Sequence, residues 1–94
     1  MNRAEFETKC AAEGYEIIDR EMEADHFNGD HAHDFDAYVL IIDGEMTISR
    51  HGKPGIFRAG DMCTVPAGTM HTEKCGPAGA RYVAGRRFQA RAAS

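Results

Sequence analysis

The residues best suited to chemistry in this chain are its histidines, and two of them, His31 and His33, stand two positions apart. Successive side chains on a β-strand point to opposite faces, so a strand through this segment would turn both imidazoles the same way. Neutral imidazole is a common ligand of iron, zinc, copper and nickel ions. A His-x-His pair is frequent by chance, however, and two satisfied histidines at the surface are the simpler interpretation of the pair by itself.

A second motif later in the chain changes that interpretation. Gly44 follows His33 by eleven residues, and residues 60–71 read Gly-Asp-Met-Cys-Thr-Val-Pro-Ala-Gly-Thr-Met-His. Together these features resemble the two-part signature of the cupin family, whose second part is G(x5)PxG(x2)H. Every spacing of that part is kept as far as His71, and the resemblance covers roughly residues 24–87.

The resemblance implies a jelly-roll, or double-stranded β-helix, barrel in which His31, His33 and His71 bind a divalent metal ion. Three imidazoles would leave coordination positions open to water or substrate, as in catalytic metal sites. The ion could be iron, zinc, nickel, manganese or copper, because geometry and supply decide among them. A neutral ligand set leaves the ion its full charge, so the site should attract an anionic or chelating small molecule.

The sequence departs from the family pattern at Ala37, where a glutamate usually completes the metal site. Asp36 is adjacent, but a regular strand would turn its side chain to the face opposite the histidines. A β-bulge would be needed to bring Asp36 in as a fourth ligand. The other interpretation is a solvated turn residue.

A second departure is Cys75, which stands where the family has an asparagine and shares a strand face with His71 and Glu73. If His71 points into the barrel, Glu73 and Cys75 should follow it. Glu73 is therefore a candidate catalytic acid or base, with a solvated place at the barrel mouth as the alternative. Cys75 is interpreted as a small buried hydrophobe. His26 and His51 do not fit the ligand spacing and are expected at the surface.

The elements that must position these residues are one short helix and a series of strands. Asn2, Glu5 and Gly14 predict a capped helix over residues 2–13. Short runs rich in β-branched and aromatic residues, separated by turn signals, predict an all-β barrel after it. The expected strands are Tyr15–Glu21, His31–Ala37 continuing into Tyr38–Asp43, Glu45–Arg50, Gly55–Arg58, Asp61–Val65, Thr69–Cys75 and Arg81–Arg87.

We expect a single cupin domain over residues 15–94, with the helical segment 1–14 packed on it. The run Tyr38–Ile42 is apolar at every position, so both of its faces need cover. The helix or a partner subunit could cover the outer face. Small size and the opposite charge of the two halves of the chain also favour a homodimer. Phe35, Val39, Ile41, Met62 and Tyr82 are available to line a ligand pocket.

Composition excludes several classes of protein. The net charge of −4 argues against nucleic acid as a partner. No apolar run approaches the roughly 18 residues of a membrane span, and the beginning of the sequence lacks a signal-peptide pattern. Three cysteines without a CxxC pair fit reduced thiols. A cytoplasmic protein that binds neither membrane nor nucleic acid is therefore expected.

The function that we predict is a metal-binding cupin that acts on a small molecule by oxidation, isomerisation or lyase chemistry. The resemblance implies the class of site only, since one fold carries many activities. Two alternatives stay open: a non-catalytic module that binds a metal or small ligand, and a structural cupin with an empty site.

Overall fold

The computed structural model describes residues 1–88, so residues 89–94 of the predicted domain lie outside the described residues. One helix precedes six antiparallel strands, which confirms the all-β jelly-roll barrel with a short N-terminal helix. The elements are α1 (Arg3–Glu13), β1 (Glu16–Met22), β2 (Phe27–His31), β3 (Phe35–Arg50), β4 (Lys53–Arg58), β5 (Met62–Val65) and β6 (His71–Phe88).

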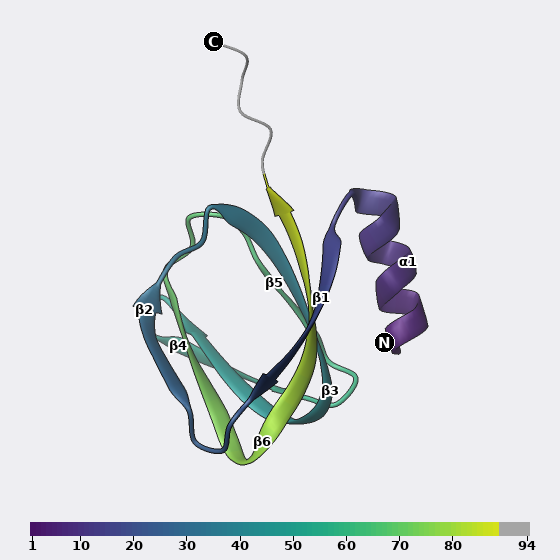
Figure 1. Ribbon diagram of the computed structural model, residues 1–94. Helices are drawn as coiled ribbons and strands as arrows, with labels where there is room; N and C mark the ends of the chain where they lie inside the picture. Colours follow the sequence, from purple (N-terminus) through teal and green to yellow (C-terminus); the bar gives the residue numbers. More distant parts are fainter. Residues whose placement is uncertain (89–94) are drawn as a thin grey trace.

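The two longest strands, β3 and β6, form the frame of the barrel (Figure 1). They pair from Phe35 opposite Phe88 to Arg50 opposite His71, with register shifts on either side of Asp43 and Gly44. In one half of the sheet β1 pairs with β6 and β5 with β3. In the other half β2 pairs with β6 and β4 with β3. Alternate side chains of both halves meet in one buried cluster, which includes Val39, Ile41, Met46, Ile48 and Cys75.

The predicted ends of strands near Gly44 and Gly79 are wrong, because β3 and β6 run through both positions. Gly44 has a φ of 84° and Gly79 a φ of 79°, a conformation that glycine adopts without steric cost. Each glycine bends its strand where the register shifts, and the strands stay paired. Strand ends are predicted beside these glycines because a bulge and a turn have the same local sequence signal.

Replacing Gly44 with alanine is expected to lower the free energy of unfolding by about 2 kcal/mol. A Cβ at Gly44 would overlap the carbonyl oxygen of Gly79, and its positive φ would be strained for any other residue. The matched control is Gly52→Ala, because Gly52 has a φ of 73° with nothing within 4 Å of the added Cβ. Urea denaturation should show only about 1 kcal/mol of destabilisation for Gly52→Ala. Equal losses in the two variants would contradict the close contact.

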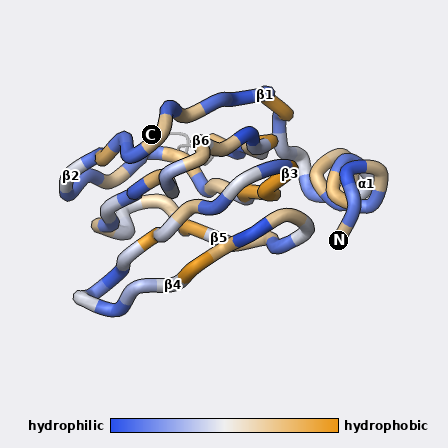
Figure 2. The backbone as a smooth tube through the Cα atoms, turned by 90° about the horizontal axis from the view of Figure 1, so that it is seen from below, coloured by the Kyte–Doolittle hydropathy of each residue, from blue (hydrophilic) through white to orange (hydrophobic). Residues whose placement is uncertain are grey.

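The N-terminal helix covers the outer face of the apolar run in β3. Asn2 and Glu5 form the predicted capping box, and Gly14 ends the helix in the left-handed conformation. Phe6 and Cys10 are fully buried in a second cluster that also contains Tyr15, Tyr38, Leu40 and Val83. Figure 2 shows α1 outside the strands, on the side of the molecule away from β2.

The helix therefore supplies the cover for which a partner subunit was the alternative. The homodimer stays a prediction, now supported by small size and charge alone. None of the helices within residues 1–88 is long and apolar enough to cross a membrane.

Candidate metal centre

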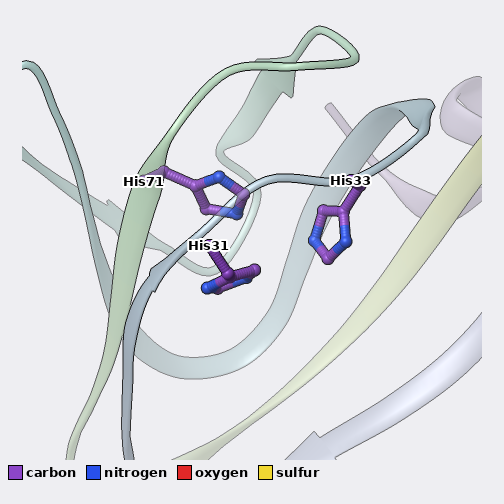
Figure 3. Close-up of side chains that lie close together, drawn as sticks. All are labelled: His31, His33 and His71. Carbon is purple, nitrogen blue, oxygen red and sulfur yellow. The ribbon is translucent and has the colours of Figure 1, made fainter.

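The three histidines of the predicted metal site lie close together (Figure 3). Their ligand atoms all lie within 4.8 Å of one another. His31 is the last residue of β2 and pairs across the sheet with His71, the first residue of β6. The ring centroids are 4.2 Å apart for His31 and His71, 4.9 Å for His31 and His33, and 5.2 Å for His33 and His71.

His33 reaches this cluster from a connection between strands, so the predicted continuous strand from His31 through Ala37 is wrong. The strand β2 ends at His31, and β3 begins at Phe35. The His33 carbonyl accepts a hydrogen bond from the Gly68 amide at 2.9 Å, which ties the connection to the turn after Pro66. The His33 ring also stacks on Phe35, with centroids 4.5 Å apart. Tertiary contacts, rather than strand alternation, therefore aim His33 at the other two rings.

Hydrogen bonds to the backbone fix the orientation of two of the imidazoles. The Nδ1 atom of His31 lies 2.7 Å from the Gly29 carbonyl oxygen, and Nδ1 of His71 lies 2.9 Å from that of Thr69. A carbonyl oxygen only accepts, so both Nδ1 atoms carry the proton. The lone pairs of His31 and His71 are then on Nε2, which is the arrangement typical of metal-binding histidines.

The donor set fits a divalent transition metal ion. Burial lowers the pKa of His33, and the neighbouring His31 and His71 lower it further. A low pKa keeps the imidazole neutral, which is the form that binds metal. His71 is only 2% exposed, so the cluster is closed on its side. Borderline ions such as iron(II), zinc and nickel match three nitrogen donors of this kind.

Glu73 lies beside the histidine cluster rather than in water at the barrel mouth. Its side chain is 16% exposed, and its Oε1 atom lies 3.5 Å from Nε2 of His31 while Oε2 lies 3.9 Å from Nε2 of His71. The Asn28 side-chain amide donates to Oε1 at 3.1 Å. Strand alternation from His71 indicated this inward direction, whereas Asn28 could be found only from the pairing of β2 with β6.

Two other acidic or thiol candidates lie away from the histidines. The Asp36 carboxylate accepts hydrogen bonds from the Ala67 amide at 2.9 Å and from Arg87 at 3.1 Å, so it holds a loop and is no neighbour of the cluster. Cys75 is buried in the core, and burial raises the pKa of its thiol. The interpretation of Cys75 as a small hydrophobe therefore agrees with its place in the structure.

The remaining histidines lie outside the cluster. His51 is exposed in the β3–β4 turn, with a φ of 53°. His26 is exposed as well, and its Nε2 atom lies 2.9 Å from the side-chain oxygen of Asn28. His26 nevertheless lines the pocket described next, a position that its spacing from His31 did not indicate.

The cluster opens into a pocket of about 510 Å³ between the two halves of the barrel. Of the residues available for a pocket wall, Phe35, Val39 and Tyr82 line it, and so does Ala37. Ile41 and Met62 are not among the residues that line it: Ile41 is buried in the first cluster, and Met62 packs against the second.

Two arginines in the wall of this pocket, Arg20 and Arg86, were missed by the sequence analysis. Arg20 is two residues before the inward-facing Met22, and Arg86 is four residues after Tyr82. Strand alternation from those neighbours was the signal that would have found them.

Comparisons with known proteins agree with the fold described above. The sequence model of the family described as "Cupin domain" matches residues 20–82. An RmlC-like cupin from Shewanella frigidimarina NCIMB 400 has a TM-score of 0.68 at 21% identity, over 77% of this chain and 64% of that chain. No curated protein matches the chain.

Two named proteins share the fold as well. KdgF from Halomonas sp. has a TM-score of 0.65 at 16% identity, over 78% of this chain and 68% of that one. The DMSP lyase DddQ from Ruegeria pomeroyi DSS-3 has a TM-score of 0.71 at 20% identity, over 82% of this chain but only 40% of the lyase. At these identities the likeness concerns the fold alone.

Proposed function

The chain belongs to the Cupin domain family, and from that premise we propose that it binds a divalent transition metal ion through His31, His33 and His71 and acts on a small molecule. The observation that carries the proposal is the convergence of three ligand atoms within 4.8 Å of one another, beside a pocket of about 510 Å³ whose wall includes His33 and His71. A purely structural metal site would be closed by a fourth protein ligand, whereas a pocket beside three ligands gives a small molecule access.

The residues around the cluster have separable roles in this proposal. When bound, the metal ion supplies Lewis acidity toward an oxygen atom of the small molecule. The carbonyl groups of Gly29 and Thr69 orient the imidazoles of His31 and His71. Phe35 and Val39 exclude water from the pocket wall. Glu73, whose oxygens face the same Nε2 atoms, accepts or returns a proton of the bound molecule.

Proton transfer by a carboxylate beside a Lewis acid is a step that isomerase and lyase reactions share. A lyase is among the proteins with this fold. Its low identity carries no activity to this chain, so the reaction proposed here rests on Glu73 and the pocket. Glu73 has a defined part in such a proton transfer, and we favour isomerase or lyase chemistry for that reason.

The first test is metal content and the accessibility of the bound ion. Protein purified without a chelating tag should contain about one transition-metal ion per chain. Cobalt(II) can then replace that ion in chelator-treated protein, and azide should change the visible absorption of cobalt because an open coordination position accepts it. If the bound cobalt is stoichiometric but azide leaves its absorption unchanged, the site is a closed structural one. Protein purified without any bound ion would contradict the proposal.

Replacing Glu73 with glutamine is expected to lower metal affinity by no more than about 100-fold, because we propose that Glu73 transfers a proton and does not coordinate the ion. Loss of a group that only supports the ligands commonly reduces affinity by about 10–100-fold at most. Calorimetric titration of zinc into chelator-treated wild type and Glu73→Gln measures the difference. A loss well beyond 100-fold would make Glu73 a ligand of the ion and leave the proposed reaction without its base.

A further inference from the structure

The Nε atom of Arg86 is a buried hydrogen-bond donor without an acceptor among the described residues. The side chain as a whole is 29% exposed and lines the pocket beside the histidines. Within residues 1–88 its ion-pair partner is Glu16, which is 74% exposed and lies 4.0 Å from a terminal nitrogen, at the limit of an ion pair. A buried charged donor left without an acceptor costs free energy, and an acceptor that enters the pocket could be bound by the partly exposed guanidinium of the same side chain.

Aromatic rings hold the Arg86 guanidinium in place. Its central carbon lies 5.6 Å from the centroid of Phe35 and 5.8 Å from that of Phe88. The two rings are themselves 5.2 Å apart. Cation–π contacts of this kind fix the orientation of the charged group before any ligand arrives, which lowers the entropy lost on binding.

The residue across the sheet from Arg86 leaves space for a ligand. Ala37 is paired with Arg86 in the register of β3 and β6, it is buried, and it lines the same pocket. A methyl group cannot accept a hydrogen bond from a guanidinium. Arg20, whose neighbour in the β1–β6 register is Tyr82, adds a second positive charge to this wall.

The acidic residue beside the histidines, Glu73, lies on the other half of the barrel from Arg86, whereas Glu21 and Glu23 line the pocket from the end of β1 and just after it. Glu73 belongs to the part of β6 that pairs with β2, whereas Arg86 belongs to the part that pairs with β1. His33 connects the two regions, because its ring stacks on Phe35 and Phe35 in turn contacts the guanidinium. An anionic group would therefore be attracted to Arg86 and repelled by Glu73, which gives a bound molecule one orientation.

We propose that the substrate is a small organic carboxylate whose carboxylate group accepts hydrogen bonds from Arg86 while its other end reaches the histidine cluster. The second half of this statement rests on the proposed metal-dependent function; the first half does not. Planar guanidinium binds carboxylate through two parallel hydrogen bonds, which makes the recognition specific for that group.

The test uses malonate and succinate as carboxylate probes and succinamide as the uncharged match of succinate. Each is titrated by calorimetry into chelator-treated wild type at low ionic strength. We expect at least one of the dicarboxylates to bind, and succinamide to bind at least about tenfold more weakly than succinate. If neither dicarboxylate binds to the metal-free or the zinc-loaded protein, the proposal is overturned.

The variants assign the effect to one residue. Arg86→Gln should weaken dicarboxylate binding at least about tenfold, and Arg86→Lys, which keeps the charge but loses the fork of donors, should fall between it and wild type. Arg81→Gln is the matched control, because Arg81 lies on the same strand with its side chain 65% exposed beside Glu21. Circular dichroism checks the fold of each variant. If Arg81→Gln and the Arg86 variants lose the same dicarboxylate affinity, the loss comes from net charge alone, and the assignment to Arg86 is overturned.

Zinc separates the two halves of the proposal. Loading wild type with zinc should raise dicarboxylate affinity at least about tenfold, and His71→Ala should abolish this gain. If dicarboxylate binding depends on Arg86 but is unchanged by zinc, the carboxylate site is upheld and the metal-dependent function is contradicted.

Discussion

Protein carrying His71→Ala is expected to lose its bound metal, from about one divalent ion per chain to background. His71 is the most buried of the three histidines, and its Nε2 atom is directed by the hydrogen bond from Nδ1 to the Thr69 carbonyl. Loss of a group that merely supports a ligand reduces affinity by about 10–100-fold, so loss of one ligand in three should exceed 100-fold. Elemental analysis of the purified protein and zinc titration of the chelator-treated protein measure the effect.

His31→Ala and His33→Ala should behave in the same way, because each removes one of the three clustered ligand atoms. The matched control is His51→Ala, which removes an exposed imidazole from the turn between β3 and β4. Its metal content should equal that of wild type. Near-stoichiometric metal in folded His71→Ala protein would show that this histidine is no ligand and that the proposed centre is wrong.

The parts of the site that sequence could predict are those held by short-range spacing. The glycines and proline of residues 60–71 place His71 at the start of β6, and alternation along that strand turns Glu73 and Cys75 inward with it. The place of His33 was predicted for the wrong reason. Its direction comes from the Gly68 amide and the Phe35 ring, contacts that alternation along one strand does not encode.

The sequence did not decide whether the helix or a partner subunit covers the outer face of the apolar run Tyr38–Ile42, because the apolar stripe of the helix has only two residues. Phe6 and Cys10 are spaced to share a face, but the sequence did not show which surface that face would meet. Packing against Tyr38, Leu40 and Val83 settles the matter in the folded chain.

Arg86 shows the same dependence on pairing. An arginine near the end of a strand is ordinarily solvated, and the lack of an acceptor for its Nε within residues 1–88 follows from the register that sets it opposite Ala37. That register joins segments far apart in the chain, so alternation along β6 could place Arg86 in the pocket wall but could not report the missing acceptor. Ala37 departs from the family pattern, and Arg86 Nε lacks an acceptor within residues 1–88. Both observations concern one pair of positions, which lie opposite each other in β3 and β6.

Ala37→Glu is expected to change two affinities in opposite directions. Ala37 is buried in the wall that it shares with His33 and His71, and it faces Arg86 across the strand pair. A carboxylate there would offer the ion an oxygen ligand at about 2.0–2.2 Å. Metal affinity should therefore rise by about 10–100-fold. The same carboxylate would fill the space opposite Arg86 and accept its unpaired hydrogen bond, so malonate and succinate should bind at least about tenfold more weakly.

Ala37→Gln is the matched control, since it adds the same volume without charge or an anionic ligand atom. It should weaken dicarboxylate binding by occupying the pocket, yet leave metal affinity close to that of wild type. Calorimetric titration of iron(II), zinc and nickel into the three chelator-treated proteins, followed by succinate, measures both quantities. A rise in metal affinity with unchanged succinate binding would uphold the metal centre and remove Arg86 as the carboxylate site. Unchanged affinities for both ligands in folded Ala37→Glu protein would mean that position 37 faces neither group, which would contradict the register of β3 on which the carboxylate proposal depends.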